Sequence, residues 1–140
     1  MHLDEVAGWF RGCGNQVRFI QASDKVKYHL AAAVCSNHVV AVIAQSLKLM
    51  EECGFDEDSA LAALRPLMAG NMDHIVRDGV TKSLTGPVER ADAGTVRKHL
   101  SVLNENDRQL YKLLSAILVS VGKKKNPGRD YSAIEEILRQ

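Results

Sequence analysis

Apolar residues recur at helical spacing through residues 25–53, a stretch that contains neither glycine nor proline. The stripe consists of Val26, Leu30, Val34, Val40, Ile43, Leu47 and Met50. This period predicts one long helix, and an apolar face of this length predicts that neighbouring elements bury most of it. Gly54 is expected to end the helix, because glycine readily adopts the left-handed backbone that follows a helix.

Further apolar stripes predict helices on both sides of the long one. The one that begins at Asp56 is expected to kink at Pro66, which removes a hydrogen bond, and to end at Gly79. About three-quarters of the chain falls in helical patterns, well above the usual third, so the sequence predicts an all-α fold. The predicted helices cover residues 3–11, 25–53, 56–78, 92–103 and 108–121, with a final amphipathic segment over 131–140.

Residues 16–20 (QVRFI) depart from the helical period. Val17, Phe19 and Ile20 are β-branched or aromatic and follow a glycine-rich turn, so this segment is predicted to be a short strand. A single strand leaves its backbone donors and acceptors without partners. The sequence therefore predicts either pairing with another chain or the last strand of a sheet that this polypeptide lacks.

Two connections are predicted to be irregular. Residues 81–92 are expected to form mostly loop, because Gly86 and Pro87 interrupt any regular element. Asp92 then caps the next helix. Residues 123–129 (KKKNPGR) are predicted to form a solvated, mobile segment after Gly122.

Composition narrows the class of protein. The 140 residues are 46% hydrophobic and 25% charged, with a formal net charge of +1, so no strong field attracts nucleic acid or an anionic membrane. Cys13, Cys35 and Cys53 form no metal or redox pair and are interpreted as reduced thiols. The N-terminus is not that of a signal peptide, and no apolar run reaches the length of a membrane span. We expect a cytoplasmic protein.

The common cofactor and metal motifs are absent from the sequence. Gly12 and Gly14 precede the predicted strand and lack a third glycine, so they do not form a dinucleotide-binding turn. No phosphate-binding Walker loop, zinc-protease motif or serine-hydrolase elbow occurs. No two of the five histidines have the spacing that presents a metal site from one helix face. No metal is expected.

Polar residues nevertheless interrupt the first half of the long helix. Lys25, His29 and Ser36 share one face by the helical period, with Asn37 at its edge and Tyr28 adjacent. They lie among alanines, whose small side chains let a ligand or another backbone come close. The alternative is a buried polar cluster whose members satisfy one another.

A second polar group lies in the sequence LTGPVERAD at residues 84–92. An anionic or carbonyl-bearing ligand could be bound here, beside the start of a helix, by Thr85, Gly86, Pro87 and Arg90. The simpler interpretation is a helix connection in which Gly86 and Pro87 set the turn. The sequence leaves both open.

Taken in order, these motifs resemble a known family. K-x-x-Y-H-x-A-A, S-N, L-T-G-P, R-x-D and T-x-x-x-H-L are similar to the C-terminal helical domain (domain of unknown function 2520) of bacterial Rossmann-like oxidoreductases. That family is similar to pyrroline-5-carboxylate reductase, to coenzyme-F420-dependent NADP reductases and, more distantly, to 6-phosphogluconate dehydrogenases. The resemblance covers about residues 16–118, and Ala91 stands where the family usually has glycine.

The resemblance implies two parts of the chain with different roles. Residues 1–22 would be the last helix and strand of a Rossmann domain, and residues 23–140 a helical substrate and dimerisation domain. NADP or NAD would bind the complete enzyme through a Rossmann domain from the same or a neighbouring gene, and no cofactor is expected on this chain alone. A homodimer and a small-molecule substrate are implied as partners, with neither nucleic acid nor membrane.

Roles for the polar residues follow from the chemistry of hydride transfer in such an enzyme. His29, Ser36 and Asn37 are the catalytic candidates, and the substrate-binding candidates are Lys25, Tyr28, Thr85, Gly86, Pro87 and Arg90. His99 belongs to the same conspicuous polar set. A second hypothesis, from a different class, is a free-standing helical interaction module without catalysis.

Overall fold

The computed structural model describes residues 2–140, and helix accounts for 79% of the chain. No strand occurs among these residues, so the predicted all-α fold is confirmed. The chain divides into two compact units, Met1–Leu61 (unit 1) and Ala62–Gln140 (unit 2), and each is described by itself. The predicted boundary between residues 22 and 23 stays a prediction.

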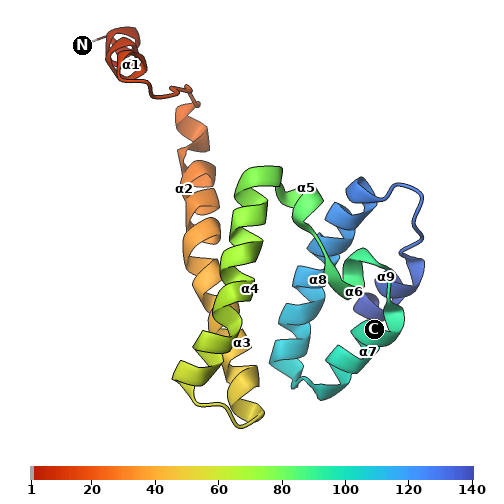
Figure 1. Ribbon diagram of the computed structural model, residues 1–140. Helices are drawn as coiled ribbons and strands as arrows, with labels where there is room; N and C mark the ends of the chain where they lie inside the picture. The colour runs from red at the N-terminus through yellow and green to blue at the C-terminus, as the bar shows by residue number, and fades with distance from the viewer. Residues whose placement is uncertain (1) are drawn as a thin grey trace. The chain divides into compact units, whose positions relative to one another are not determined.

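Unit 1 is built around one long helical segment (Figure 1). Helix α1, Leu3–Gly12, comes first. A 3-10 turn at Ala22–Asp24 (η1) leads into α2 at Lys25–Ala33, a π-helical turn at Val34–His38 (η2) and α3 at Val39–Glu52. The helix therefore runs through the predicted region and is widened once by the π turn.

The long helix is not buried, which corrects the prediction from its apolar stripe. No residue of α2, η2 or α3 is buried, and Val26, Val40 and Leu30 are 77%, 66% and 56% exposed. The periodicity predicted a helix correctly because it reflects the side on which apolar residues gather. It cannot tell whether the same chain supplies the surface that covers them.

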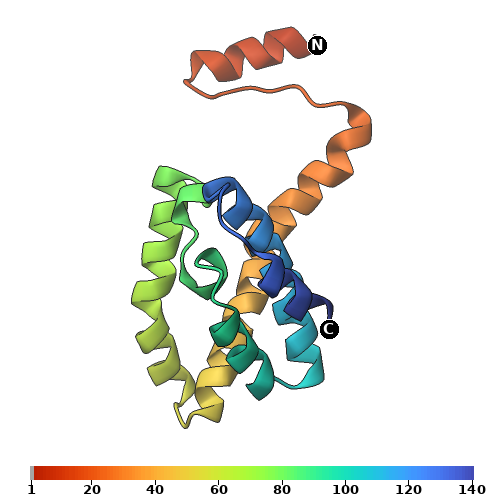
Figure 2. The ribbon, with the colours of Figure 1, turned by 90° about the vertical axis from the view of Figure 1, so that its right-hand side faces the viewer.

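The predicted strand is also wrong. Residues 15–21 have no regular secondary structure and form an extended connection between α1 and η1 (Figure 2). Val17, Phe19 and Ile20 have a high preference for strands, but a strand requires a hydrogen-bonding neighbour. The described residues contain no other extended segment paired with it. Arg11 lies over the Phe19 ring at 5.9 Å instead.

Helix α4, Glu57–Asp78, begins and ends as predicted. Asp56 accepts a hydrogen bond from the Ser59 backbone at 2.8 Å, and the Ser59 contacts hold the pKa of the Asp56 carboxyl below its usual value. Pro66 lies inside the helix. Gly79 ends it with a φ of +82°, a conformation that glycine adopts without a Cβ clash.

Unit 2 continues through five more helices. They are α5 (Val80–Ser83), α6 (Gly86–Glu89), α7 (Ala93–Val102), α8 (Glu105–Lys125) and α9 (Ser132–Arg139). The region predicted as mostly loop thus contains two single-turn helices, α5 and α6. The sequence did not predict them because a single turn is too short to show a helical repeat of apolar residues.

In unit 2, α5, α6 and α9 pack against α8, and α7 packs against α6 and α9 (Figure 1). The buried residues of the core are Val88, Val96, Leu100, Val119, Tyr131, Ile134 and Ile137. The last three belong to the final amphipathic segment predicted over residues 131–140. The amphipathic pattern of residues 131–140 therefore marks a core element that closes this unit.

The predicted solvated segment after Gly122 is corrected as well. Helix α8 passes through Gly122 to Lys125, and Gly122 is buried. A Cβ at Gly122 would lie only 2.7 Å from the Tyr131 hydroxyl, so glycine is required for the approach of that ring. Lys123 forms an ion pair with Glu135 of α9 at 2.6 Å.

Candidate functional site

The TGP turn, residues 84–90, begins with a strongly bent backbone. Thr85 is extended and exposed, and Gly86 follows with a φ of +92°, where an L side chain would be strained. Pro87 lies in the first turn of α6, where its missing N–H costs nothing. Val88 is buried in the core. The buried Val88 thereby anchors the turn to the core, while Thr85 is exposed to solvent.

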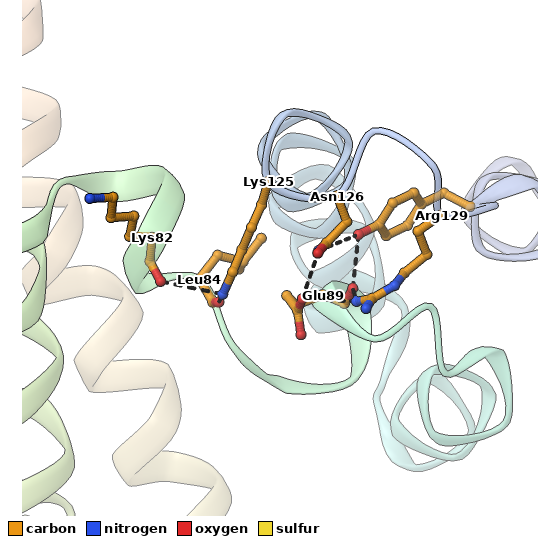
Figure 3. Close-up of polar contacts among 7 residues, drawn as sticks. Lys82, Leu84, Glu89, Lys125, Asn126 and Arg129 are labelled. Atoms are coloured by element: carbon orange, nitrogen blue, oxygen red, sulfur yellow. Dashed lines mark hydrogen bonds and ion pairs between the residues drawn. The ribbon is translucent and has the colours of Figure 1, made fainter.

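The C-terminal segment holds the beginning of this turn (Figure 3). The Lys125 ammonium donates to the Leu84 carbonyl at 2.7 Å and to the Lys82 carbonyl at 3.3 Å. The Lys82 carbonyl lies in the last turn of α5 and the Leu84 carbonyl directly after it, where the end of a helix leaves carbonyls without donors from the helix itself. One cation therefore stabilises two backbone acceptors that are more than forty residues away in sequence.

The end of the turn is held at Glu89 (Figure 3). Asn126 donates to its carboxylate at 2.7 Å, and Arg129 forms an ion pair with the same oxygen at 2.8 Å. Tyr131 donates its hydroxyl proton to the Glu89 carbonyl at 2.8 Å, and Arg129 donates to that carbonyl as well. The Asn126 hydrogen bond and then Arg129 hold the pKa of Glu89 below its usual value.

Arg90 follows immediately and is exposed. Within the described residues its side chain makes no hydrogen bond or salt bridge, although its charge helps to lower the pKa of Asp92, which Thr95 lowers most. Ala91 has a φ of +57°, the one described residue other than glycine with a left-handed backbone. Asp92 caps α7 as predicted, accepting from the Thr95 amide at 3.0 Å.

A groove of about 440 Å³ borders Thr85 within unit 2. Its polar lining from α4 includes Asn71, His74 and Arg77, none of which the sequence singled out as substrate-binding residues. The available signal was their spacing of three, which places them on one face of a helix. Arg77 is engaged by Asp73 at 3.3 Å and Asp78 at 2.9 Å, so its charge is already balanced.

The other predicted site residues lie on the long helix of unit 1. Ser36 and Asn37 belong to the π turn, and His29 lies on α2 before it. Ser36 donates to the Ala32 carbonyl at 2.9 Å, and its oxygen is 3.3 Å from Asn37 Oδ1. A π turn costs stability and is frequent at functional sites. It coincides here with the polar interruption of the apolar stripe.

All five predicted residues of this helix are exposed, so the alternative of a buried polar cluster is wrong. Lys25 and Tyr28 lie near the start of α2, and Tyr28 borders a hollow with Phe10 and Ile20. The structure brings Ser36 and Asn37 together, and separately Thr85, Gly86, Pro87 and Arg90. That the two sets form one site stays a prediction, because they belong to different units.

His99 has a structural role. Its Nδ1 lies 2.9 Å from the Tyr111 hydroxyl, and the two rings meet edge to face at 5.7 Å. The contact ties α7 to α8, and burial raises the pKa of Tyr111. Among residues 2–140, no group of three or more acidic, histidine or cysteine side chains is arranged to hold a metal ion.

The long helix also bears on the membrane. By length and composition alone, Ala22–Glu52 is a candidate membrane span, and none of its apolar window is buried. The prediction that no apolar run reaches this length is corrected by that finding. Core helices of soluble proteins and signal sequences near an N-terminus have the same length and composition.

Comparison with protein families gives one decisive result. The model described as Domain of unknown function (DUF2520) matches residues 2–117, most of the chain. The chain belongs to the DUF2520 family. The match contains both predicted sets of site residues and ends within α8, so the segment that holds the TGP turn of this DUF2520 protein lies beyond it. The comparison with curated proteins and the comparison with solved structures each found no match.

Proposed function

We propose that this chain is the substrate-binding and dimerisation part of an NAD(P)-dependent oxidoreductase. The observation that carries the proposal is the TGP turn, whose backbone is fixed at both ends while Thr85 and Arg90 remain exposed. A preorganised turn that leaves polar groups uncommitted is what recognition of a small ligand requires. The resemblance of the motifs to reductase domains supplies the reaction class.

The roles in this proposal follow from hydride transfer to a carbonyl or imine. Arg90 meets a substrate carboxylate, since a guanidinium can bind both of its oxygens. Thr85 and Asn37 orient the reacting group, and His29 with Ser36 supplies the proton to the developing oxyanion or amide anion. Lys25 and Tyr28 are further candidates beside His29, and Gly86 and Pro87 give the turn its shape.

The cofactor would be bound by a Rossmann domain from the same gene or a neighbouring one. NADP or NAD needs a strand, a glycine turn and a helix N-terminus for its pyrophosphate, and the described residues offer no strand. We expect the helical chain to complete the substrate pocket and the Rossmann domain to present the nicotinamide.

A second copy of this chain is the proposed cover for the long helix. Its apolar stripe is exposed at Val26, Leu30, Val34 and Val40, and its alanine-rich first half allows two helices to approach closely. A bilayer is the less favourable cover, because Ser36, Asn37 and His38 in the middle of the helix would lose their hydration there. We therefore expect a cytoplasmic homodimer.

The same exposed stripe favours a second candidate function, a helical interaction module without catalysis. Such a module needs the apolar face of α2 and α3 but not an exposed Thr85 or Arg90. The two functions differ in what replacement of those residues does. A module keeps its assembly and has no turnover to lose.

The deciding experiment starts from the DNA upstream of Met1. If an in-frame Rossmann coding region is present, the joined protein is assayed for NADPH oxidation with small carbonyl and imine carboxylates. We expect turnover, and we expect Arg90→Gln to raise KM at least about tenfold, the cost of one charged hydrogen-bond pair. The control is Arg97→Gln, an exposed arginine of α7. Absence of a Rossmann region in the gene and its neighbours would favour the interaction module.

A further inference from the structure

The residues that hold the TGP turn come from a segment outside the part of the chain matched by the DUF2520 family. Four side chains make these contacts, and we call them the clasp: Lys125, Asn126, Arg129 and Tyr131. We propose that the clasp positions the TGP turn for ligand binding. Its relevance to catalysis rests on the proposed function of that turn.

The first step of the argument is mechanical. Lys125 holds the carbonyl of Leu84 at the start of the turn, and Tyr131 with Arg129 holds the carbonyl of Glu89 at its end. Tyr131 is itself buried, in contact with Gly122 of α8. Both ends of the turn are therefore held by residues of the helical core, and this fixes the backbone positions of Thr85 and Arg90.

The second step concerns charge. The Glu89 carboxylate accepts from Asn126 and pairs with Arg129, and its side chain is only 14% exposed. If these partners were removed, the carboxylate would be adjacent to Arg90 in sequence and free to pair with it. Neighbouring residues do pair in this protein, since Arg77 and Asp78 lie 2.9 Å apart. By occupying Glu89, the clasp keeps Arg90 available to a ligand carboxylate.

Hydrogen exchange of the full chain tests the mechanical step. The amides of Arg90, Ala91 and Asp92 donate within the turn at 3.1, 3.1 and 2.8 Å and report its order. In Tyr131→Phe, which removes only the hydroxyl, we expect these amides to exchange about 5-fold faster, as one hydrogen bond implies. Amides in the middle of α8 should exchange no more than about 2-fold faster.

The matched control is Ile137→Val, which trims the same core without touching Glu89. Such a truncation costs about 0.5–1.5 kcal/mol, similar to a hydrogen bond. If the control accelerates exchange at residues 90–92 as much as Tyr131→Phe does, the clasp contributes only to general stability and the proposal is overturned. The same holds if Tyr131→Phe leaves these amides unchanged.

A ligand titration tests the charge step, with pyruvate as the probe and backbone chemical shifts as the readout. Arg129→Ala should weaken pyruvate binding at least about 5-fold by freeing Glu89 to pair with Arg90. Adding Glu89→Gln to that variant should restore binding, an outcome that a merely structural loss would not produce. Failure of this rescue overturns the charge step.

The two proposals fail in different ways. If the wild-type chain does not bind pyruvate and Arg90→Gln changes nothing, the carboxylate-binding function of the turn is lost. The exchange data at residues 90–92 still decide whether the clasp orders the turn. If pyruvate binds equally to wild type and Arg129→Ala, the function survives and the clasp proposal fails.

Discussion

The two units use similar amounts of apolar sequence in opposite ways. In unit 2, residues as far apart as Val88 and Ile137 share one core, and long-range hydrogen bonds join α6 to the C-terminal segment. In unit 1, the long helix has an equally regular stripe, yet none of its residues is buried. An apolar stripe thus shows only which face of a helix is apolar. The surface that covers this face can belong to the same chain or to another molecule.

The largest expected effect concerns the exposed stripe of unit 1. Replacing Val40 with lysine places a charge in the centre of the proposed dimer interface and should weaken association about 100-fold, since it loses apolar burial and adds a desolvation cost. Sedimentation equilibrium over a range of micromolar concentrations measures this. The control is Gln45→Lys, on the other side of α3 by the helical period.

A wild-type chain that is monomeric throughout this range would remove the proposed dimer. Unit 1 would then need a different cover for its stripe, such as the proposed Rossmann domain. Equal weakening by both lysine variants would show that charge alone, and not the apolar stripe, controls the association.

The next effect concerns the core of unit 2. Gly122→Ala should lower the free energy of unfolding by about 1–3 kcal/mol, because its new methyl group would lie 2.7 Å from the Tyr131 hydroxyl. Urea unfolding followed by circular dichroism measures the change. Gly70→Ala in α4 is the matched control, since a Cβ there meets nothing within 4 Å and should stabilise the helix slightly. A neutral Gly122→Ala would mean that Tyr131 can leave this position freely.

A smaller, stabilising effect is expected at the end of the TGP turn. Ala91 has a φ of +57°, where alanine is strained and glycine is not. Ala91→Gly should stabilise unit 2 by up to about 1 kcal/mol, the strain relieved less the greater freedom of glycine in the unfolded chain. The midpoint of thermal unfolding measures it, and Ala93→Gly, inside α7, should destabilise instead. A lower midpoint for Ala91→Gly would contradict a strained Ala91.

The smallest effect is a pH dependence at Glu89. Its folded pKa is lowered from about 4.5, chiefly by Asn126 and then Arg129, so its contribution to stability is present above that value and is lost as pH falls through the folded pKa. The difference in unfolding free energy between wild type and Glu89→Gln should therefore shrink on acidification below about pH 4.5.

Titration of Glu89 is isolated by this subtraction, because Asp56, Asp92 and Asp130, whose pKa values are also lowered, are common to both proteins. Arg129 and Lys125 are the cations whose charges help to lower the Glu89 pKa, and they too are common to both proteins. A difference that stays constant with pH would mean that Glu89 titrates alike in the folded and unfolded chains.

The sequence alone determined the local features of the fold, which are the helix caps, a helix end and the path of the long helix. Asp56 and Asp92 as helix caps, Gly79 as a helix end and the helical path of residues 25–52 were all predicted, because each depends on partners within three or four positions. The polar interruption at Ser36 and Asn37 was visible too, although not the π turn that it marks.

What only the tertiary structure decided are the contacts between residues far apart in the chain. Nothing local in the sequence couples Lys125 to Leu84 or Tyr131 to Glu89, more than forty residues away. Residues 123–129 were therefore wrongly predicted to be solvated. The groove that joins His74 to Thr85 was missed for the same reason. The prediction of a strand at residues 16–20 was wrong for a related reason. The side chains there prefer a strand, but a strand forms only beside a hydrogen-bonding neighbour, which local sequence preference does not provide.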